Sequence, residues 1–105
     1  MLALVVYIPE SHLEIVKDAL FDAGAGRIGN YDRCCFQSEG TGQFRPLPEA
    51  NPFAGKVGVL ETCMEWRVEM VFEDSLRQKV ESALKESHPY ETPAYWILKL
   101  ENGSL

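Results

Sequence analysis

The sequence predicts an α+β fold, a four-stranded antiparallel sheet with two helices packed on one face. The first observation is the order of patterns along the 105 residues: strand, helix, strand, strand, helix, strand. The second is strict two-residue alternation over residues 59–72, typical of an antiparallel strand. The third is a stretch rich in Gly and Pro, residues 39–58, which separates the second strand from the third. This order is a split β-α-β repeat, so we predict a ferredoxin-like βαββαβ fold in one domain, residues 1–105.

The first strand and the first helix are predicted by an apolar run and a capping pattern. Residues 2–8 are continuously apolar and end at Pro9, as in a strand buried on at least one face. Ser11 and Glu14 match a capping box, in which each side chain would bond the other's backbone N–H. Apolar residues then recur at helical spacing, so we predict a helix over residues 12–23.

The middle of the chain is predicted to hold a short strand and a long loop. Residues 32–38 can form the second strand. Residues 39–58 form the loop and carry Phe44, Leu47 and Phe53 as isolated apolar residues. Loops of this length are usually functional or part of an assembly. The spaced aromatic residues argue against simple disorder.

The alternation in residues 59–72 predicts a long strand with one buried face and one polar face. The acidic residues of the polar face are most simply solvated or paired with basic residues of the next strand; a metal site made of these carboxylates is the less favoured alternative. The apolar side is Leu60, Thr62, Met64, Trp66, Val68, Met70 and Phe72, and the polar side is Glu61, Cys63, Glu65, Arg67 and Glu69.

The C-terminal third is predicted to add a second helix and the last strand. Asp74 or Ser75 can cap the helix, and the sequence His88-Pro ends it. Residues 94–101 form the last strand, and residues 102–105 a loose tail. The first and last strands are apolar on both sides. The sheet face away from the helices should therefore be covered by the long loop, by another subunit, or by both.

The charge and the apolar pattern exclude several classes of partner. The net charge is −6 and the 10 Lys and Arg residues are scattered, which disfavours nucleic acids and membrane surfaces. No apolar run approaches the ~20 residues of a membrane-spanning helix. The N-terminus lacks the basic region and the cleavage site of a signal peptide, so we expect a cytoplasmic protein. Cys34, Cys35 and Cys63 are then most simply free thiols.

Gly24, Gly26 and Gly29 spell the G-x-G-x-x-G pattern of dinucleotide-binding proteins. In those proteins the pattern follows a strand and opens a helix, whose N-terminus faces the phosphates. Here it follows a helix and precedes a strand, so a phosphate would face the negative end of the helix dipole. We therefore interpret Gly24 as the end of the helix and the other two glycines as a tight crossover.

The sequence His88-Pro-Tyr-Glu91 is the second motif whose side chains could act in catalysis or in metal binding. A histidine and a glutamate at this spacing could form an acid–base or metal-binding pair. The structural interpretation is preferred, because a histidine at a helix end bonds well to the last carbonyls. The other histidine, His12, has no nucleophile beside it in the sequence, and no G-x-S-x-G occurs, so we predict no catalytic residues and no enzymatic activity.

Five segments together resemble a known family: GAGRIGNYDRCCF, GTGQFRP, ANPFAGKVGVLE, EWRVEMVF and HPYETPAY. In this order they are similar to the YqfO-type insertion domain found in some proteins related to NGG-one-interacting factor three, and also as a free-standing chain. The His-Pro-Tyr-Glu segment also resembles CutA, the divalent-cation tolerance protein, whose subunits form trimers, and the fold resembles that of PII signalling proteins. The resemblance implies a CutA-like or PII-like module that associates through its sheet edges and long loop. The dinuclear metal site of the larger proteins is not carried over, because its ligands belong to the surrounding domain.

Two functional hypotheses follow. The first is a homo-oligomer, expected to be a trimer, that binds a small ligand or has a regulatory role, with loop 39–58 and segments 24–31 and 88–93 lining a cleft between subunits. The second is a divalent-metal-binding protein of the CutA type, with His88 and Glu91 as metal ligands and a cysteine as a further candidate. No other cofactor is predicted. The residues expected to contact the ligand are His88, Tyr90, Glu91, Asn30 and Tyr31.

Overall fold

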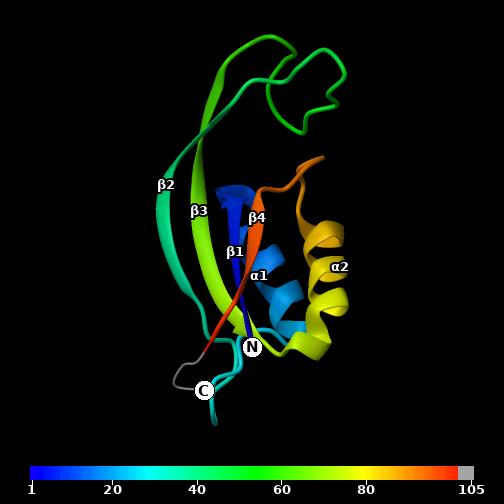
Figure 1. The fold of residues 1–105 in the computed structure, drawn as a ribbon. Helices are drawn as coiled ribbons and strands as arrows, with labels where there is room; N and C mark the ends of the chain where they lie inside the picture. Colours follow the sequence, from blue (N-terminus) through cyan, green and yellow to red (C-terminus); the bar gives the residue numbers. More distant parts are fainter. Residues whose placement is uncertain (102–105) are drawn as a thin grey trace.

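The chain forms the predicted two-layer α+β structure, with both helices on one side of a four-stranded sheet (Figure 1). The computed structural model describes residues 1–101, and the predicted loose tail, residues 102–105, lies outside them. The elements are β1 (Leu2–Pro9), the 3-10 helix η1 (Glu10–His12), α1 (Leu13–Asp22), β2 (Phe36–Phe44), β3 (Glu61–Phe72), the 3-10 helix η2 (Asp74–Leu76), α2 (Arg77–Ser87) and β4 (Tyr95–Lys99).

The sheet has the order β2-β3-β1-β4, and every neighbouring pair is antiparallel. This is the ferredoxin-like order that the sequence predicts. Leu4 of β1 lies opposite Met70 of β3 and Ile97 of β4. The register therefore places the apolar positions of three strands on the same face.

The hydrophobic core lies between this face of the sheet and the two helices. β1 is its centre, because it is flanked by strands on both sides and is covered by α1 and α2 (Figure 1). Deeply buried aliphatic and aromatic side chains fill the layer, each of them at most 1% exposed: Leu4, Val6, Ile8, Val16, Leu20, Val68, Phe72, Val80 and Leu84.

Both helices begin differently from the prediction. Each is preceded by a 3-10 helix, and neither N-terminus is capped by a side chain. The Ser11 hydroxyl bonds to Nδ1 of His12 at 2.8 Å instead of to the helix backbone. Asp74 accepts a hydrogen bond from the ammonium group of Met1 at 2.5 Å. Ser11 thus bonds to its neighbour in the sequence and Asp74 to the distant N-terminus, and neither acts as the predicted cap.

The second strand lies later in the chain than predicted. β2 runs from Phe36 to Phe44, whereas the prediction was residues 32–38, and the connection to β3 is correspondingly residues 45–60. Gly40 and Gly42 argued for a loop, but they pair with Glu65 and Cys63 of β3 through backbone groups alone. The N-terminal part of β3 and the C-terminal part of β2 extend beyond the helices as a two-stranded arm (Figure 1).

The arm explains why the apolar side of β3 is buried over only part of its length. Val68, Met70 and Phe72 are buried beneath the helices, as the alternation predicts. Leu60 and Met64 are 60% and 40% exposed, because they lie on the arm. The alternation identified the buried face over residues 66–72, but on the arm the predicted polar side is the less exposed one, since Cys63 and Glu65 are half-buried.

The glycine-rich segment after α1 is a crossover, as its position in the sequence predicts. Gly24, Gly26 and Gly29 have φ angles of 104°, 84° and 57°, which are unfavourable for other residues. The N–H of Gly26 donates to the carbonyl of Val71 at 2.8 Å, and its own carbonyl accepts from the N–H of Cys34 at 2.8 Å. The segment therefore fastens the connection between α1 and β2, in the first βαβ half, to the end of β3 in the second half.

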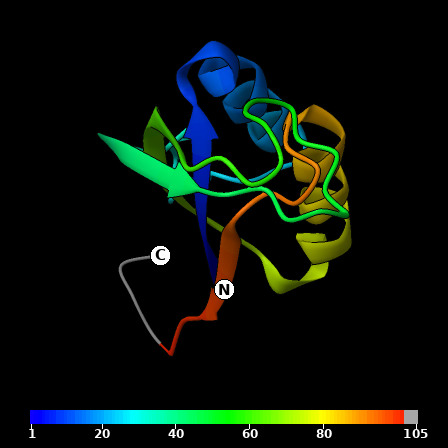
Figure 2. The same cartoon turned by 90° about the horizontal axis from the view of Figure 1, so that it is seen from above.

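The sheet face away from the helices remains open in the single chain. Phe36, Trp96 and Leu98 lie on this face and are 67%, 55% and 52% exposed. The long loop, one of the covers that the sequence suggested, folds instead over the end of the domain where η1 lies (Figure 2). No helix in residues 1–101 is long and apolar enough to cross a membrane.

Candidate functional site

A cavity of about 260 Å³ lies where the loop of residues 45–60 meets the segment that follows α2. In Figure 2 the loop runs beside the segment between α2 and β4 and over the start of α1. The walls are largely apolar, with two carboxylates among them. The lining residues are Gln43, Phe44, Pro46, Ala50, Pro52, Phe53, Ala54, Glu65, Tyr90, Glu91, Thr92 and Ala94.

His88 fixes the segment that carries one wall of this cavity. Its side chain is 5% exposed, and both ring nitrogens are bonded to backbone groups. Nδ1 lies 3.2 Å from the N–H of Tyr90, which can only donate, so Nδ1 is the acceptor. Nε2 lies 2.7 Å from the carbonyl oxygen of Tyr7 and therefore carries the proton. The neutral ring thus clamps the end of α2 to the end of β1.

Burial lowers the pKa of His88, and this effect outweighs the bond to the Tyr7 carbonyl, which raises it. The imidazole is consequently held in the neutral form that its two hydrogen bonds require. This is the structural role that the sequence favoured for a histidine at a helix end, although its bond partner is a strand carbonyl instead of a helix carbonyl.

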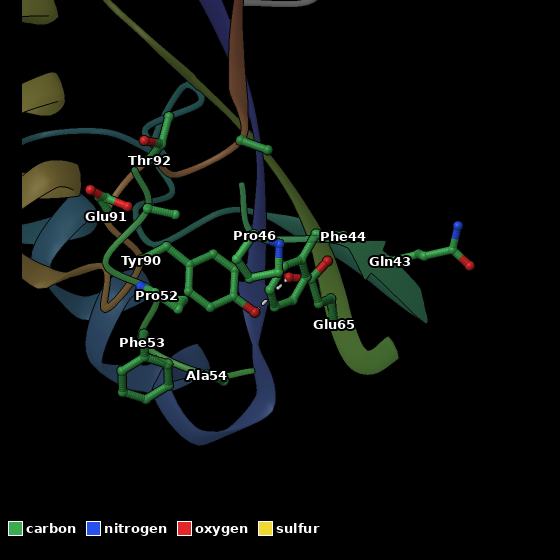
Figure 3. Close-up of a pocket in the computed structure, with 12 residues that line it drawn as sticks. Gln43, Phe44, Pro46, Pro52, Phe53, Ala54, Glu65, Tyr90, Glu91 and Thr92 are labelled. Atoms are coloured by element: carbon green, nitrogen blue, oxygen red, sulfur yellow. Dashed lines mark hydrogen bonds between the residues drawn. The ribbon is translucent and has the colours of Figure 1, made fainter. Parts of the chain in front are cut away.

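Tyr90 crosses the cavity, with its hydroxyl directed at Glu65 (Figure 3). The hydroxyl donates to Oε2 of Glu65 at 2.8 Å, and Sγ of Cys63 lies 3.6 Å from the hydroxyl oxygen of Tyr90. Burial raises the pKa of Tyr90, and the neighbouring Cys63 and Glu65 raise it further. The phenol therefore stays protonated and donates its hydrogen bond to Glu65, which orients that carboxylate.

The tyrosine ring also holds the loop in place. Its centroid lies 6.3 Å from that of Phe44 and 6.1 Å from that of Phe53. Phe53 in turn meets the ring of His12 edge-on at 5.5 Å. The loop of residues 45–60 is thus anchored by aromatic contacts to η1 and to Tyr90, as its isolated aromatic residues suggested.

Glu91 supplies a polar contact between the loop and the segment after α2. Its Oε1 accepts a hydrogen bond from the backbone N–H of Asn51 at 3.0 Å. A bond to a charged acceptor is stronger than one between neutral groups. Glu91 therefore fixes the loop over the cavity from the side opposite Glu65 (Figure 3).

The structure brings together three of the five predicted ligand-contacting residues. His88, Tyr90 and Glu91 lie at the cavity, with His88 behind its wall. Asn30 and Tyr31 are exposed and lie at the opposite end of the sheet, in the segment between α1 and β2 (Figure 1). Within one chain, segment 24–31 therefore does not share a cleft with the loop and segment 88–93.

In the predicted metal pair, both ring nitrogens of His88 and one of the two carboxylate oxygens of Glu91 are engaged in hydrogen bonds. Neither nitrogen of His88 has a free lone pair in the folded state, and Oε1 of Glu91 already accepts from Asn51. Within residues 1–101, no three His, Cys, Asp or Glu side chains converge as a metal site would need.

Glu65 lines the cavity and Cys63 lies beside the Tyr90 hydroxyl, although the sequence pattern assigned both to a solvated polar face. Glu65 bonds to a tyrosine 25 positions later in the chain, and such pairing is invisible to local pattern. One signal was present, since a glycine stands at position 42 in the neighbouring strand. A Cβ on Gly42 would overlap the carboxylate of Glu65, so the glycine makes room for the site.

Gly42→Ala should therefore displace Glu65 and lower the pKa of Tyr90 towards its ordinary value. The matched control is Gly40→Ala in the same strand, where a Cβ would meet nothing within 4 Å. Ultraviolet titration of tyrosinate, with Tyr90→Phe to identify its contribution, measures the change. Equal titrations of the Gly42 and Gly40 variants would contradict the arrangement.

Known proteins resemble this chain over nearly its whole length, although no protein-family model matches it. A GTP cyclohydrolase 1 type 2 homolog of Halalkalibacterium halodurans is 48% identical over 99 residues, which are 94% of this chain and 27% of that protein. The protein of the same name from Bacillus subtilis is 50% identical over 98 residues, 93% of this chain and 26% of that protein. The chain thus spans about a quarter of the length of these curated relatives.

Solved structures give the same picture. A Bacillus cereus protein related to NIF3 superposes with a TM-score of 0.83 at 44% identity, covering 96% of this chain and 26% of that one. CutA from Pyrococcus horikoshii superposes with a TM-score of 0.68 at 20% identity, covering 98% of this chain and 87% of that one, which shows a shared fold. The resemblance stated from the motifs is confirmed: the chain is similar over almost its whole length to one segment of the NIF3-related proteins, and its ferredoxin-like fold is that of CutA.

Proposed function

We propose that this chain is a small homo-oligomeric module that binds a small ligand, in a regulatory role, in the cavity between residues 45–60 and residues 90–94. The observation that carries the proposal is the way the cavity is built. A long loop without regular structure is fastened by the bond from Asn51 to Glu91 and by Phe53 against Tyr90. Specific contacts that hold a loop over a cavity are typical of binding sites.

The name of the curated relatives suggests a guanine nucleotide, but the cavity does not favour one. Phosphates are bound by Arg, Lys or backbone N–H groups. The residues that line this cavity include Glu65 and Glu91 but no Lys or Arg within the described part of the chain. Any nucleotide chemistry of the relatives would belong to the three quarters of those proteins that this chain does not match.

Purification without denaturation tests the ligand site. In native mass spectra we expect the wild type to carry a small molecule that Ala50→Trp, which fills the cavity, does not retain. Ser82→Trp on the exposed side of α2 is the control and should retain it. An Ala50→Trp protein with the same bound mass would place the ligand elsewhere. Zinc or copper in these spectra would support the metal-binding alternative instead.

The homo-oligomer is supported by the open sheet face. Phe36, Trp96 and Leu98 are large, apolar and more than half exposed on one surface, and such surfaces mark protein contacts. Following the family resemblance, we propose a trimer in which copies of this face are buried.

Trp96→Asp should dissociate the oligomer, because it places a carboxylate in an apolar contact. By sedimentation at micromolar concentration we expect a trimer for the wild type and a monomer for the variant. Gln78→Asp adds the same charge on exposed α2 and should leave the trimer intact. A strictly monomeric wild type would remove the oligomer from the proposal.

A further inference from the structure

We infer that the cavity selects a small organic cation, an amine or quaternary ammonium group on a short apolar body. The inference rests on the proposed function, since it names the class of ligand for the same site. Three independent properties of the cavity support it: its charge, its aromatic walls and its size.

The charge of the cavity is negative and has no protein counterion. Glu65 receives a hydrogen bond from a neutral phenol, and Glu91 receives one from a backbone N–H. Among the ion pairs of residues 1–101 neither carboxylate takes part. Glu65 is half-buried and Glu91 is exposed, and a charge at the protein surface attracts an opposite charge more strongly than it would in bulk water. The two carboxylates therefore attract a cationic ligand and repel an anionic one.

The aromatic walls favour an organic cation over a metal ion. The rings of Phe44, Phe53 and Tyr90 come from three different segments, and Tyr90 lies about 6 Å from each of the other two. Aromatic faces within about 6 Å of a cation attract it, and groups of such rings bind quaternary ammonium ions. A bare divalent cation would instead need several oxygen or nitrogen ligands to replace its water.

The size of the cavity favours a compact ligand. The volume of about 260 Å³ is below the ~300–1,000 Å³ of sites that enclose drug-sized ligands. Pro46 and Pro52 stiffen the loop that forms the wall, which limits expansion. A compact ammonium compound fits these limits, and a nucleotide does not.

Choline and its uncharged analogue, in which carbon replaces the ammonium nitrogen, test the inference because they share one shape. We expect choline to bind the full chain about tenfold or more tightly than the analogue, and to shift the NMR signals of the Ala50, Ala54 and Thr92 methyl groups. Glu65→Gln keeps an oxygen for Tyr90 but removes the charge, and it should weaken choline binding about tenfold. Glu86→Gln, an exposed change on α2, should not alter it.

Two outcomes would overturn the inference. If the analogue binds the cavity as tightly as choline, the site exists but does not select a cation, and the proposed ligand site survives. If neither compound shifts the cavity methyl groups, selection of small ammonium compounds is refuted, and the native mass spectra decide separately on the proposed function. An unchanged choline affinity in Glu65→Gln would also contradict the assigned role of that carboxylate.

Discussion

Replacing His88 by alanine should lower the free energy of unfolding by about 3 kcal/mol. The His88 side chain is 5% exposed, and its removal breaks two hydrogen bonds. The Tyr7 carbonyl and the Tyr90 N–H are then left without their partners. His12→Ala, at the other histidine, should cost less than about 1 kcal/mol, because its ring makes one bond to an exposed serine and one edge contact. Urea unfolding at one fixed protein concentration measures both, since oligomers gain stability with concentration.

The same residue should make the stability depend on pH in a defined direction. Burial holds the pKa of folded His88 below its ordinary value of 6.5. The unfolded chain therefore binds more protons, and stability rises with pH in this range. The contribution of His88 should be complete above about pH 6.5 and should be lost as the pH falls from there through the lower pKa of the folded state.

His88→Gln separates titration from packing. Its amide can still donate to the Tyr7 carbonyl but has no proton to gain in this range, so the His88 part of the pH dependence should disappear. His12→Gln should retain that dependence. An equal loss of stability towards acid in the wild type and in His88→Gln would contradict the clamp.

Gly26→Ala should destabilise the fold by about 3 kcal/mol. The φ angle of 84° is unfavourable for alanine. A Cβ would also lie 2.8 Å from the ring of Phe21 and 2.9 Å from the carbonyl oxygen of Cys34, which belongs to the backbone and cannot rotate away. The crossover would have to move, and with it the bond from Gly26 to Val71.

Gly29→Ala is the matched control for this prediction. It also changes a glycine with positive φ, at 57°, but a Cβ there would meet nothing within 4 Å. Only the backbone cost of about 1 kcal/mol should then appear. Thermal unfolding of the two variants compares them, and equal losses would show that the close approach at Gly26 carries no energy.

The sequence predicted the fold wherever a residue's role depended on its neighbours along the chain. The alternation in residues 59–72 identified β3 and its buried side, and Gly24 marked the end of α1. Prediction failed where distant partners decide. Residues 39–44 pair with β3 although Gly40 and Gly42 favour a loop, and Asp74 bonds to the N-terminal ammonium group of Met1 instead of capping α2.

The candidate site, like the fold, could be predicted from the sequence only in part. His88, Tyr90 and Glu91 could be grouped from the sequence because they share one short motif. Glu65 could not, because its partner Tyr90 lies far along the chain and its neighbours suggested a solvated face. Asn30 and Tyr31 were grouped with the motif by family resemblance, yet the length of the sheet separates them from it within one chain (Figure 1).

The most direct test of the proposed ligand site is a fragment screen by NMR on the methyl groups of alanine and threonine. Weak binding is visible by this method, and Ala50, Ala54, Thr92 and Ala94 all line the cavity. We predict that bound fragments shift these four signals together, and that Ala50→Trp abolishes the shifts. Fragments that leave all four unmoved, or that shift the signals of Ala19 and Ala83 between the helices instead, would contradict a ligand site between the loop and the segment after α2.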